Sequence, residues 1–223
     1  MTGLLLVSAI AGLACALANF NDARYVSRIK HAVVTRDSGL LLANRAGAIA
    51  ADNKVNLANR LALIAFIVTG VAWLVWQHSA HRSLRSLAEP GSVRFSASDA
   101  WVWWIVPVAS LWMPLQVNRE LQDGSARLIG KPSRIPRTNV WWTCYLAAGA
   151  LSLAGSILAH VATSNAQENA TLSLFDQLLL SQWLAIAGRV VFVVTAFVAI
   201  GLVSAATQDL TSAFGRAPTS AAG

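Results

Sequence analysis

Charged residues are scarce in this sequence. Only 12% of its 223 residues are Asp, Glu, Lys or Arg, whereas 56% are hydrophobic. Soluble domains carry about 25% charged residues, so a soluble fold of this size would lack the polar surface needed to cover its core. The scarcity excludes an ordinary soluble protein and predicts helices that lie in lipid.

Cysteine is rarer still, with only Cys15 and Cys144, each inside an apolar segment. Two separated cysteines supply neither a disulfide framework nor the ligand set of a structural zinc site. We therefore expect both to be small buried hydrophobic side chains.

Residue sets that perform catalysis are also missing. The apolar segments contain no Ser-His-Asp set, no Gly-rich phosphate loop and no pair of carboxylates placed for acid–base chemistry. From this pattern we expect a non-enzymatic protein that needs no cofactor.

Acidic residues are outnumbered, because 17 Lys and Arg face 10 Asp and Glu, for a formal net charge of +7. In membrane proteins such an excess collects on the cytoplasmic side, where it meets anionic lipid. Nucleic-acid binding would need bases and aromatic side chains on a polar surface, but here the aromatics lie within apolar runs. Lipid, and not nucleic acid, is the expected partner of these bases.

Long apolar runs are what the sequence has instead. Small residues at four-residue spacing in two of them favour close contact between helices; these are Ser8, Gly12 and Ala16 in the first and Ala148, Ser152 and Ser156 in another. By length and composition, the runs that predict spanning helices are 3–18, 61–77, 140–161 and 183–206.

The stretch WVWWIVPVASLWMPLQ (101–116) is a fifth candidate, with four tryptophans, two prolines and no charge. Pro107 and Pro114 each remove a backbone donor and clash with the preceding turn of a helix. In lipid the freed carbonyls need a partner from another helix, a side chain or water. The stretch is either a kinked span or a re-entrant element packed on protein, and we expect the kinked span.

The segment 20–60 is basic, with seven Lys and Arg against three Asp. Its apolar and basic residues separate onto different helical faces, which predicts an amphipathic helix on the membrane surface, where Arg24, Arg28 and Lys30 face anionic lipid. Asp37 and Ser38 could cap a second helix that ends near residue 51. The alternative is a solvated helical hairpin without lipid contact.

These runs predict an all-α, polytopic membrane bundle of about five spanning helices. Five spans put thirteen Lys and Arg on one side and three on the other, which favours a plasma-membrane protein with its N-terminus outside and its C-terminus in the cytoplasm. The predicted parts are a first span (1–19), the basic segment (20–60), a four-helix domain (61–210) and a disordered tail (211–223).

The block WWIVPVASLWMPLQVNRE (103–120), after WQHSAHRSLRSL (76–87) and FSASDAWVWW (95–104), resembles an uncharacterised membrane family of actinobacteria, domain of unknown function 4328. That family shows W-F-x-P-x-x-N-L-W-R-P-Y-Q followed by R-E. The resemblance covers roughly residues 55–210, and the family has no agreed activity. Ser110, Met113 and Leu115 stand where the family tends to have Asn, Arg and Tyr, and Ser83 where it has Asn. The matching positions are Trp104, Pro107, Leu111, Trp112, Pro114, Gln116, Arg119 and Glu120, with Ala80 and Arg82 upstream.

Arg189 interrupts the last apolar run, and an ionisable residue inside a span is a candidate for function. It could line a polar cavity, with Gln182 on the same face, and bind an anionic group. The alternative, which we favour from sequence, is that it turns outward or pairs with Asp176 or another carboxylate. Near the motif, Arg119 and Glu120 are expected to pair locally or with the basic loop 127–137.

Histidines offer a weaker possibility. His78, His81 and His160 lie on one side in the five-span arrangement, and two imidazoles from different helices could ligate haem. No carboxylate or thiol pattern accompanies them, so no haem and no metal is predicted.

Three functions follow from these patterns. The first is an accessory or scaffold subunit of a larger membrane complex, bound to other subunits or to its own copies. The second is a small channel or transporter that uses 101–116 and Arg189, and the third is a haem-binding redox subunit. The candidate structural or polar-site residues are Trp104, Pro107, Trp112, Pro114, Gln116, Glu120 and Arg189.

Overall fold

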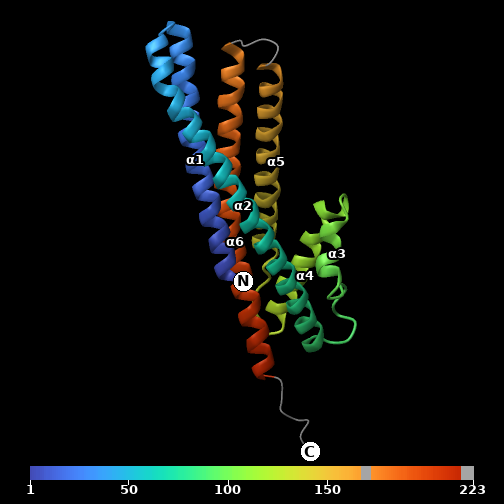
Figure 1. The fold of residues 1–223 in the computed structure, drawn as a ribbon. Coiled ribbons are helices and arrows are strands. Elements are labelled where there is room, and N and C mark those ends of the chain that lie inside the picture. The colour runs from blue at the N-terminus through green and yellow to red at the C-terminus, as the bar shows by residue number, and fades with distance from the viewer. Residues whose placement is uncertain (167–171, 217–223) are drawn as a thin grey trace, which may run out of the picture. The chain divides into compact units, whose positions relative to one another are not determined.

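The protein is all-α in the computed structural model, which describes residues 1–166 and 172–216 (Figure 1). Two long helices at each end of the chain enclose three short elements because, among the described residues, proline and glycine interrupt the helix only between residues 88 and 136. The elements in order are α1 (Thr2–Thr35), α2 (Ser38–Leu87), α3 (Asp99–Ile105), the 3₁₀ turn η1 (Ala109–Leu111), α4 (Met113–Arg127), α5 (Ile135–Ala166) and α6 (Leu172–Arg216).

Four helices, α1, α2, α5 and α6, are long and apolar enough to cross a membrane, so the chain is that of a multi-pass membrane protein. The predicted fifth span is wrong, because 101–116 is divided among α3, η1 and the start of α4. With four crossings the Lys and Arg divide nine against seven, which removes the charge argument for an outside N-terminus. An even number of crossings also puts the start of α1 and the end of α6 on one side.

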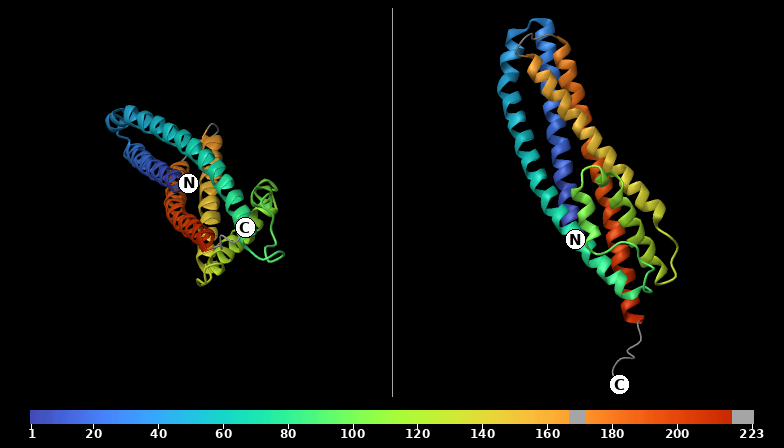
Figure 2. Two further views of the ribbon diagram at one scale, coloured as in Figure 1. Left: turned by 90° about the horizontal axis from the view of Figure 1, so that it is seen from below. Right: turned by 90° about the vertical axis from the view of Figure 1, so that its right-hand side faces the viewer.

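The basic segment 20–60 forms no separate surface helix. It consists of the end of α1 and the start of α2, which turn back on each other at residues 36 and 37 (Figures 1 and 2). Arg36 adopts a left-handed conformation (φ 54°) after the last turn of α1. The amide of Leu40 donates to Asp37 Oδ1 at 2.9 Å, so the predicted cap exists, but α2 runs on far beyond residue 51.

Two compact units make up the chain, and each long helix contributes residues to both. We call Met1–Leu6, Ile67–Thr143 and Thr195–Gly223 the motif unit, and Val7–Phe66 with Cys144–Val194 the arginine unit. The tail predicted to be disordered from residue 211 begins inside α6, which continues to Arg216; residues 217–223 lie outside the described residues.

In the motif unit, the end of α2 packs on α4 and on the end of α6. One of its core clusters consists of Ala80, Leu84, Leu121 and Leu210. Gly124 allows α4 to lie against Leu84, since a Cβ there would come within 2.9 Å of Leu84 Cδ2. This contact fixes α4, the helix that carries the second half of the Trp/Pro motif.

In the arginine unit, small residues permit close helix contact, as predicted. Ser8 and Ala16 of α1 are buried, and the hydroxyl of Ser8 donates to the carbonyl of Ala65 in α2 at 3.2 Å. On the turned-back pair of helices, Tyr25 lies directly over Gly47. Of the two cysteines, Cys15 is buried as expected, whereas Cys144 is only partly buried.

Candidate functional site

The two motif prolines act differently, and together they interrupt the apolar stretch 101–116. Val106, which precedes Pro107, is extended (ψ 110°), because the residue before a proline is pushed out of the helical region. Pro114 lies in the first turn of α4, where a missing N–H leaves no bond unmade. Pro107 therefore ends one helix and Pro114 begins another, so the stretch is not the kinked span we expected.

Donors within the motif unit reach several of the carbonyls around this break. Ser110 supplies two of them, since its amide donates to the carbonyl of Val106 at 2.8 Å and its hydroxyl to that of Pro107 at 2.7 Å. The indole of Trp142, in α5, donates to the carbonyl of Leu111 at 3.1 Å. These three carbonyls of the irregular backbone are therefore satisfied within the protein, as an apolar surrounding requires.

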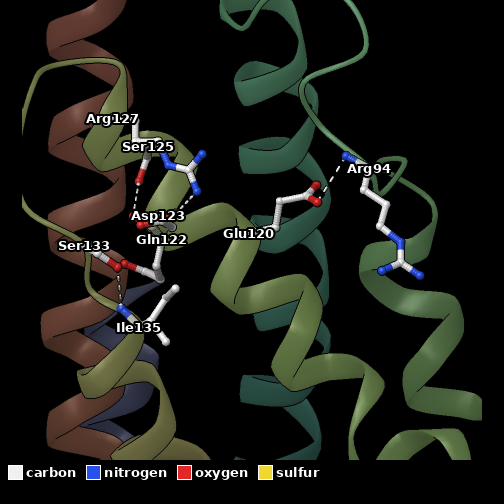
Figure 3. Close-up of polar contacts among 8 residues, drawn as sticks. All are labelled: Arg94, Glu120, Gln122, Asp123, Ser125, Arg127, Ser133 and Ile135. Carbon is white, nitrogen blue, oxygen red and sulfur yellow. Dashed lines mark hydrogen bonds and ion pairs between the residues drawn. The ribbon is translucent and has the colours of Figure 1, made fainter.

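The end of the motif fastens the linker before α3 and the start of α5 to α4. Glu120 accepts hydrogen bonds from the backbone amides of Arg94 at 3.1 Å and Phe95 at 2.9 Å, and Arg119 Nε donates to Asn139 Oδ1 of α5 at 2.7 Å. Figure 3 shows Glu120 directed at Arg94. The predicted pairing of Arg119 and Glu120 with each other or with loop 127–137 is wrong, because Glu120 instead holds the linker before α3 and Arg119 contacts the start of α5.

Tryptophans from three helices meet beside the break. Trp73 stacks on Trp141 with ring centroids 5.1 Å apart, and Trp104 meets Trp142 edge to face at 5.7 Å. The indole of Trp104 also donates to Gln77 Oε1 of α2 at 3.2 Å. The cluster joins α2, α3 and α5. Trp104 takes part in it through its ring contact with Trp142 and its hydrogen bond to Gln77.

The motif unit also contains buried polar residues that bond one helix to another. His81 Nε2 lies 3.2 Å from the carbonyl of Val117, and Gln122 Nε2 donates to the carbonyl of Leu202 in α6 at 3.2 Å. Asp209 is fully buried and pairs with both Lys131, at 2.9 Å, and Arg134. These contacts join α2 to α4, α4 to α6, and the linker before α5 to the end of α6.

We call residues 93–127 the platform. This region contains α3, η1 and α4 and carries the Trp/Pro motif. A family model for Domain of unknown function (DUF4328) matches residues 41–208. The chain belongs to the DUF4328 family. No curated protein and no solved structure matches it. The match confirms the resemblance seen in the sequence and begins earlier than the predicted residue 55.

The motif positions of this DUF4328 protein divide into inner and outer residues. Pro114 is fully buried, Trp104 and Gln116 are partly buried, and Trp112 is 46% exposed. Two departures from the family pattern are accommodated locally. Ser110 provides the hydroxyl bound to Pro107, and Met113 packs against the cluster of Phe95, Ala100 and Val117.

Sequence reasoning missed the burial of polar residues in the DUF4328 platform and on the neighbouring end of α2. Gln77 and His81 are four residues apart on α2, and Asn118 and Gln122 are four apart on α4; all four are buried. Pairs at this spacing share one helix face. The i and i+4 spacing of these polar pairs was the available signal, and it was weak because the residues around them are also largely polar.

Asp99 begins α3 and is the platform residue with a shifted pKa. Partial burial acts to raise the pKa of its carboxyl, but hydrogen bonds from the hydroxyl and amide of Ser96, both at 2.7 Å, outweigh burial and hold that pKa below its ordinary value. Asp99 therefore stays ionised near neutral pH and closes the turn that leads into α3.

Glu120 provides a direct test of how the platform is held. Replacing Glu120 with Ala leaves two amides without their acceptor, so we expect a loss of about 1–3 kcal/mol in the free energy of unfolding. Hydrogen exchange followed by mass spectrometry should show faster exchange in residues 92–98. Glu89→Ala, which removes an exposed carboxylate from the same linker, is the control. Equal exchange in both variants would contradict the assignment.

Arg189 lies in the other unit of the DUF4328 protein and contacts an amide instead of a carboxylate. Its Nη2 donates to Asn59 Oδ1 at 3.2 Å. Asp176, the expected partner, pairs with Lys30 instead, and Gln182 donates to Asp22 at 2.7 Å. The ion pair favoured from sequence is therefore wrong for Asp176, and Lys30 is occupied by protein instead of lying free toward lipid.

The remaining candidates hold backbone or stay exposed. Arg24 and Arg28 are exposed, and the guanidinium of Arg28 lies 5.7 Å from the Tyr25 ring centroid. His78 Nδ1 lies 2.8 Å from the carbonyl of Ala97, and His160 is exposed in the arginine unit. Within the described residues, no three His, Cys, Asp or Glu side chains gather as metal ligands.

Proposed function

We propose that this DUF4328 protein is a non-enzymatic accessory or scaffold subunit of a larger membrane complex, and that the platform carries the contact. The supporting observation is a group of large apolar side chains on its outer side. Ile105 and Val108 are each 66% exposed and Leu111 is 56% exposed. We call these, together with Trp101 and Trp112, the exposed apolar group.

The exposed apolar group is suited to an apolar surrounding, although α3 is too short to cross a bilayer. α3 has seven residues, which make about 10 Å of helix against a hydrocarbon core of about 30 Å. The stretch between Asp99 and Arg119 carries no charged residue. The carbonyls of Val106, Pro107 and Leu111 are bonded internally, which reduces the number of polar groups that a covering helix would have to satisfy.

We assign the covering role to an apolar helix of another membrane subunit. Tryptophan and other large side chains on a rigid support are typical of the centre of an interface. The buried side of the platform, with Ala100, Pro114 and Val117 fully enclosed, provides that support. The bilayer and anionic lipid complete the proposed surroundings, in the plasma membrane, and neither a cofactor nor nucleic acid takes part.

The predicted channel used 101–116 and Arg189 together, but these residues belong to different units. We therefore base the proposal on the platform alone and treat Arg189 separately.

Site-specific photo-cross-linking in the native membrane tests the subunit proposal. A photoreactive residue at Val108 should yield one adduct with another protein, whereas the same residue at Leu153, which is 63% exposed in the arginine unit, should yield lipid adducts only. The double variant Ile105→Ser/Val108→Ser should lose the partner in mild detergent, and Leu63→Ser/Leu153→Ser should retain it. Adducts with lipid alone, or with a second copy of this chain, would contradict the proposal.

A further inference from the structure

A polar cavity of about 290 Å³ lies within the arginine unit, among helices that are otherwise apolar. All four long helices contribute to its wall. Its polar lining includes Asn19, Asn59, Ser152, Ser156, Gln182 and Arg189. A cavity at the lower end of the usual range for ligand pockets, about 300–1,000 Å³, holds a small group and not a large ring system.

The cavity carries an uncompensated positive charge. A guanidinium has five N–H donors, and Arg189 makes one hydrogen bond, to the neutral side chain of Asn59. No carboxylate forms an ion pair with it within residues 1–166 and 172–216. Asp22, the acid bound by the cavity residue Gln182, is not part of the lining. A charge in this setting is costly unless an anion accompanies it.

The other polar groups of the lining add donors to the same charge. Asn59 uses its oxygen to accept from Arg189, which leaves its NH₂ group as a donor. Ser152 adds a hydroxyl on α5. A guanidinium, an amide NH₂ and a hydroxyl suit a phosphate group, whose three oxygens are strong acceptors and which arginine binds with a two-pronged geometry.

We propose that Arg189, Asn59 and Ser152 form a binding site for a phosphate monoester within the arginine unit. The same chemistry is offered by the head group of an anionic lipid and by a small soluble phosphate ester. The site lies apart from the platform in sequence and rests on other residues, so its failure would leave the subunit proposal untouched.

Native mass spectrometry of the purified protein tests the site. Phosphatidic acid is the lipid probe, glycerol 3-phosphate is the soluble probe and phosphatidylcholine is the neutral reference. The wild-type protein should retain phosphatidic acid over phosphatidylcholine, and Arg189→Gln should weaken this binding about tenfold or more. Arg216→Gln, which removes an exposed charge from the same helix, should bind like wild type. Competition by glycerol 3-phosphate would show that the site accepts the soluble ester, and its absence would assign the lipid.

Asn59→Asp separates loss of the site from loss of the fold. This change keeps the side-chain shape and places a carboxylate oxygen where Arg189 already donates, so the guanidinium acquires an internal counter-ion. We expect binding of phosphatidic acid to fall about tenfold or more, while the midpoint of thermal unfolding stays equal to that of wild type or rises. Wild-type binding in Asn59→Asp and Arg189→Gln, or no binding of either phosphate probe by wild type, would overturn the proposal.

Discussion

Replacing Asp209 with Ala is expected to lower the free energy of unfolding by about 3–5 kcal/mol. Asp209 is fully buried near the end of α6 and pairs with Lys131 and Arg134 of the linker that leads into α5. The side chain of Arg134 is only 14% exposed, so removing the acid leaves a buried guanidinium without its counter-ion. Titration with SDS in mixed micelles measures the loss.

Asp176→Ala is the matched control, because it removes an acid from an ion pair on the same helix. The side chain of Asp176 is 64% exposed, and exposed ion pairs contribute about 0–1 kcal/mol. We expect this variant to unfold close to the wild type. Equal losses of unfolding free energy in Asp209→Ala and Asp176→Ala would contradict the prediction. They would mean that the buried ion pairs of Asp209 stabilise the protein no more than the exposed pair of Asp176.

Replacing Gly155 with Ala is expected to cost about 1–3 kcal/mol through overpacking. Within the arginine unit, a Cβ at Gly155 of α5 would lie 2.9 Å from the carbonyl oxygen of Ser181 and 3.2 Å from the amide nitrogen of Ala185, both in α6. Backbone atoms cannot move aside as a side chain can. The reciprocal contact at Gly188, whose Cβ would meet Ser152 Oγ at 2.7 Å, shows the same close approach from the other helix.

Gly149→Ala supplies the opposite expectation on the same helix. A Cβ at Gly149 would meet no atom within 4 Å, so only the higher helix propensity of alanine acts, and it stabilises by up to about 1 kcal/mol. The two substitutions are chemically identical and should differ in sign in the same SDS titration. Destabilisation by both would point to a general intolerance of α5 and not to contact with α6.

The small-residue row predicted in 140–161 shows how much of such a contact can be found in advance. Ser152 lies in the α5–α6 contact with Gly188 and also lines the polar cavity. Gly155, which lies off the predicted row, makes the closest approach to α6. Spacing identified the helix and roughly the face, but the partner helix and the tightest residue depend on how the two helices cross.

Buried polar contacts were harder to predict. Sequence placed Arg189 within an apolar run and predicted that it turns outward or pairs with Asp176 or another carboxylate, because Asp176 is the nearest acid along the chain. The fold instead brings Lys30 to Asp176 and Asn59 to Arg189. Both contacts join residues more than a hundred positions apart, and no local pattern encodes such a pairing.

The sequence by itself determined that this is an all-α membrane protein of the DUF4328 family, with apolar runs that form four long helices. Hydropathy, run length and motif spacing are properties of the local chain, so they survive any arrangement of the helices. Only the tertiary structure decided that residues 101–116 form short helical elements and not a spanning helix. A proline can bend, end or begin a helix, and the choice depends on which donors reach the freed carbonyls. Here one of those donors is Trp142, which lies 31 residues beyond Leu111 in the sequence and beside it in the fold.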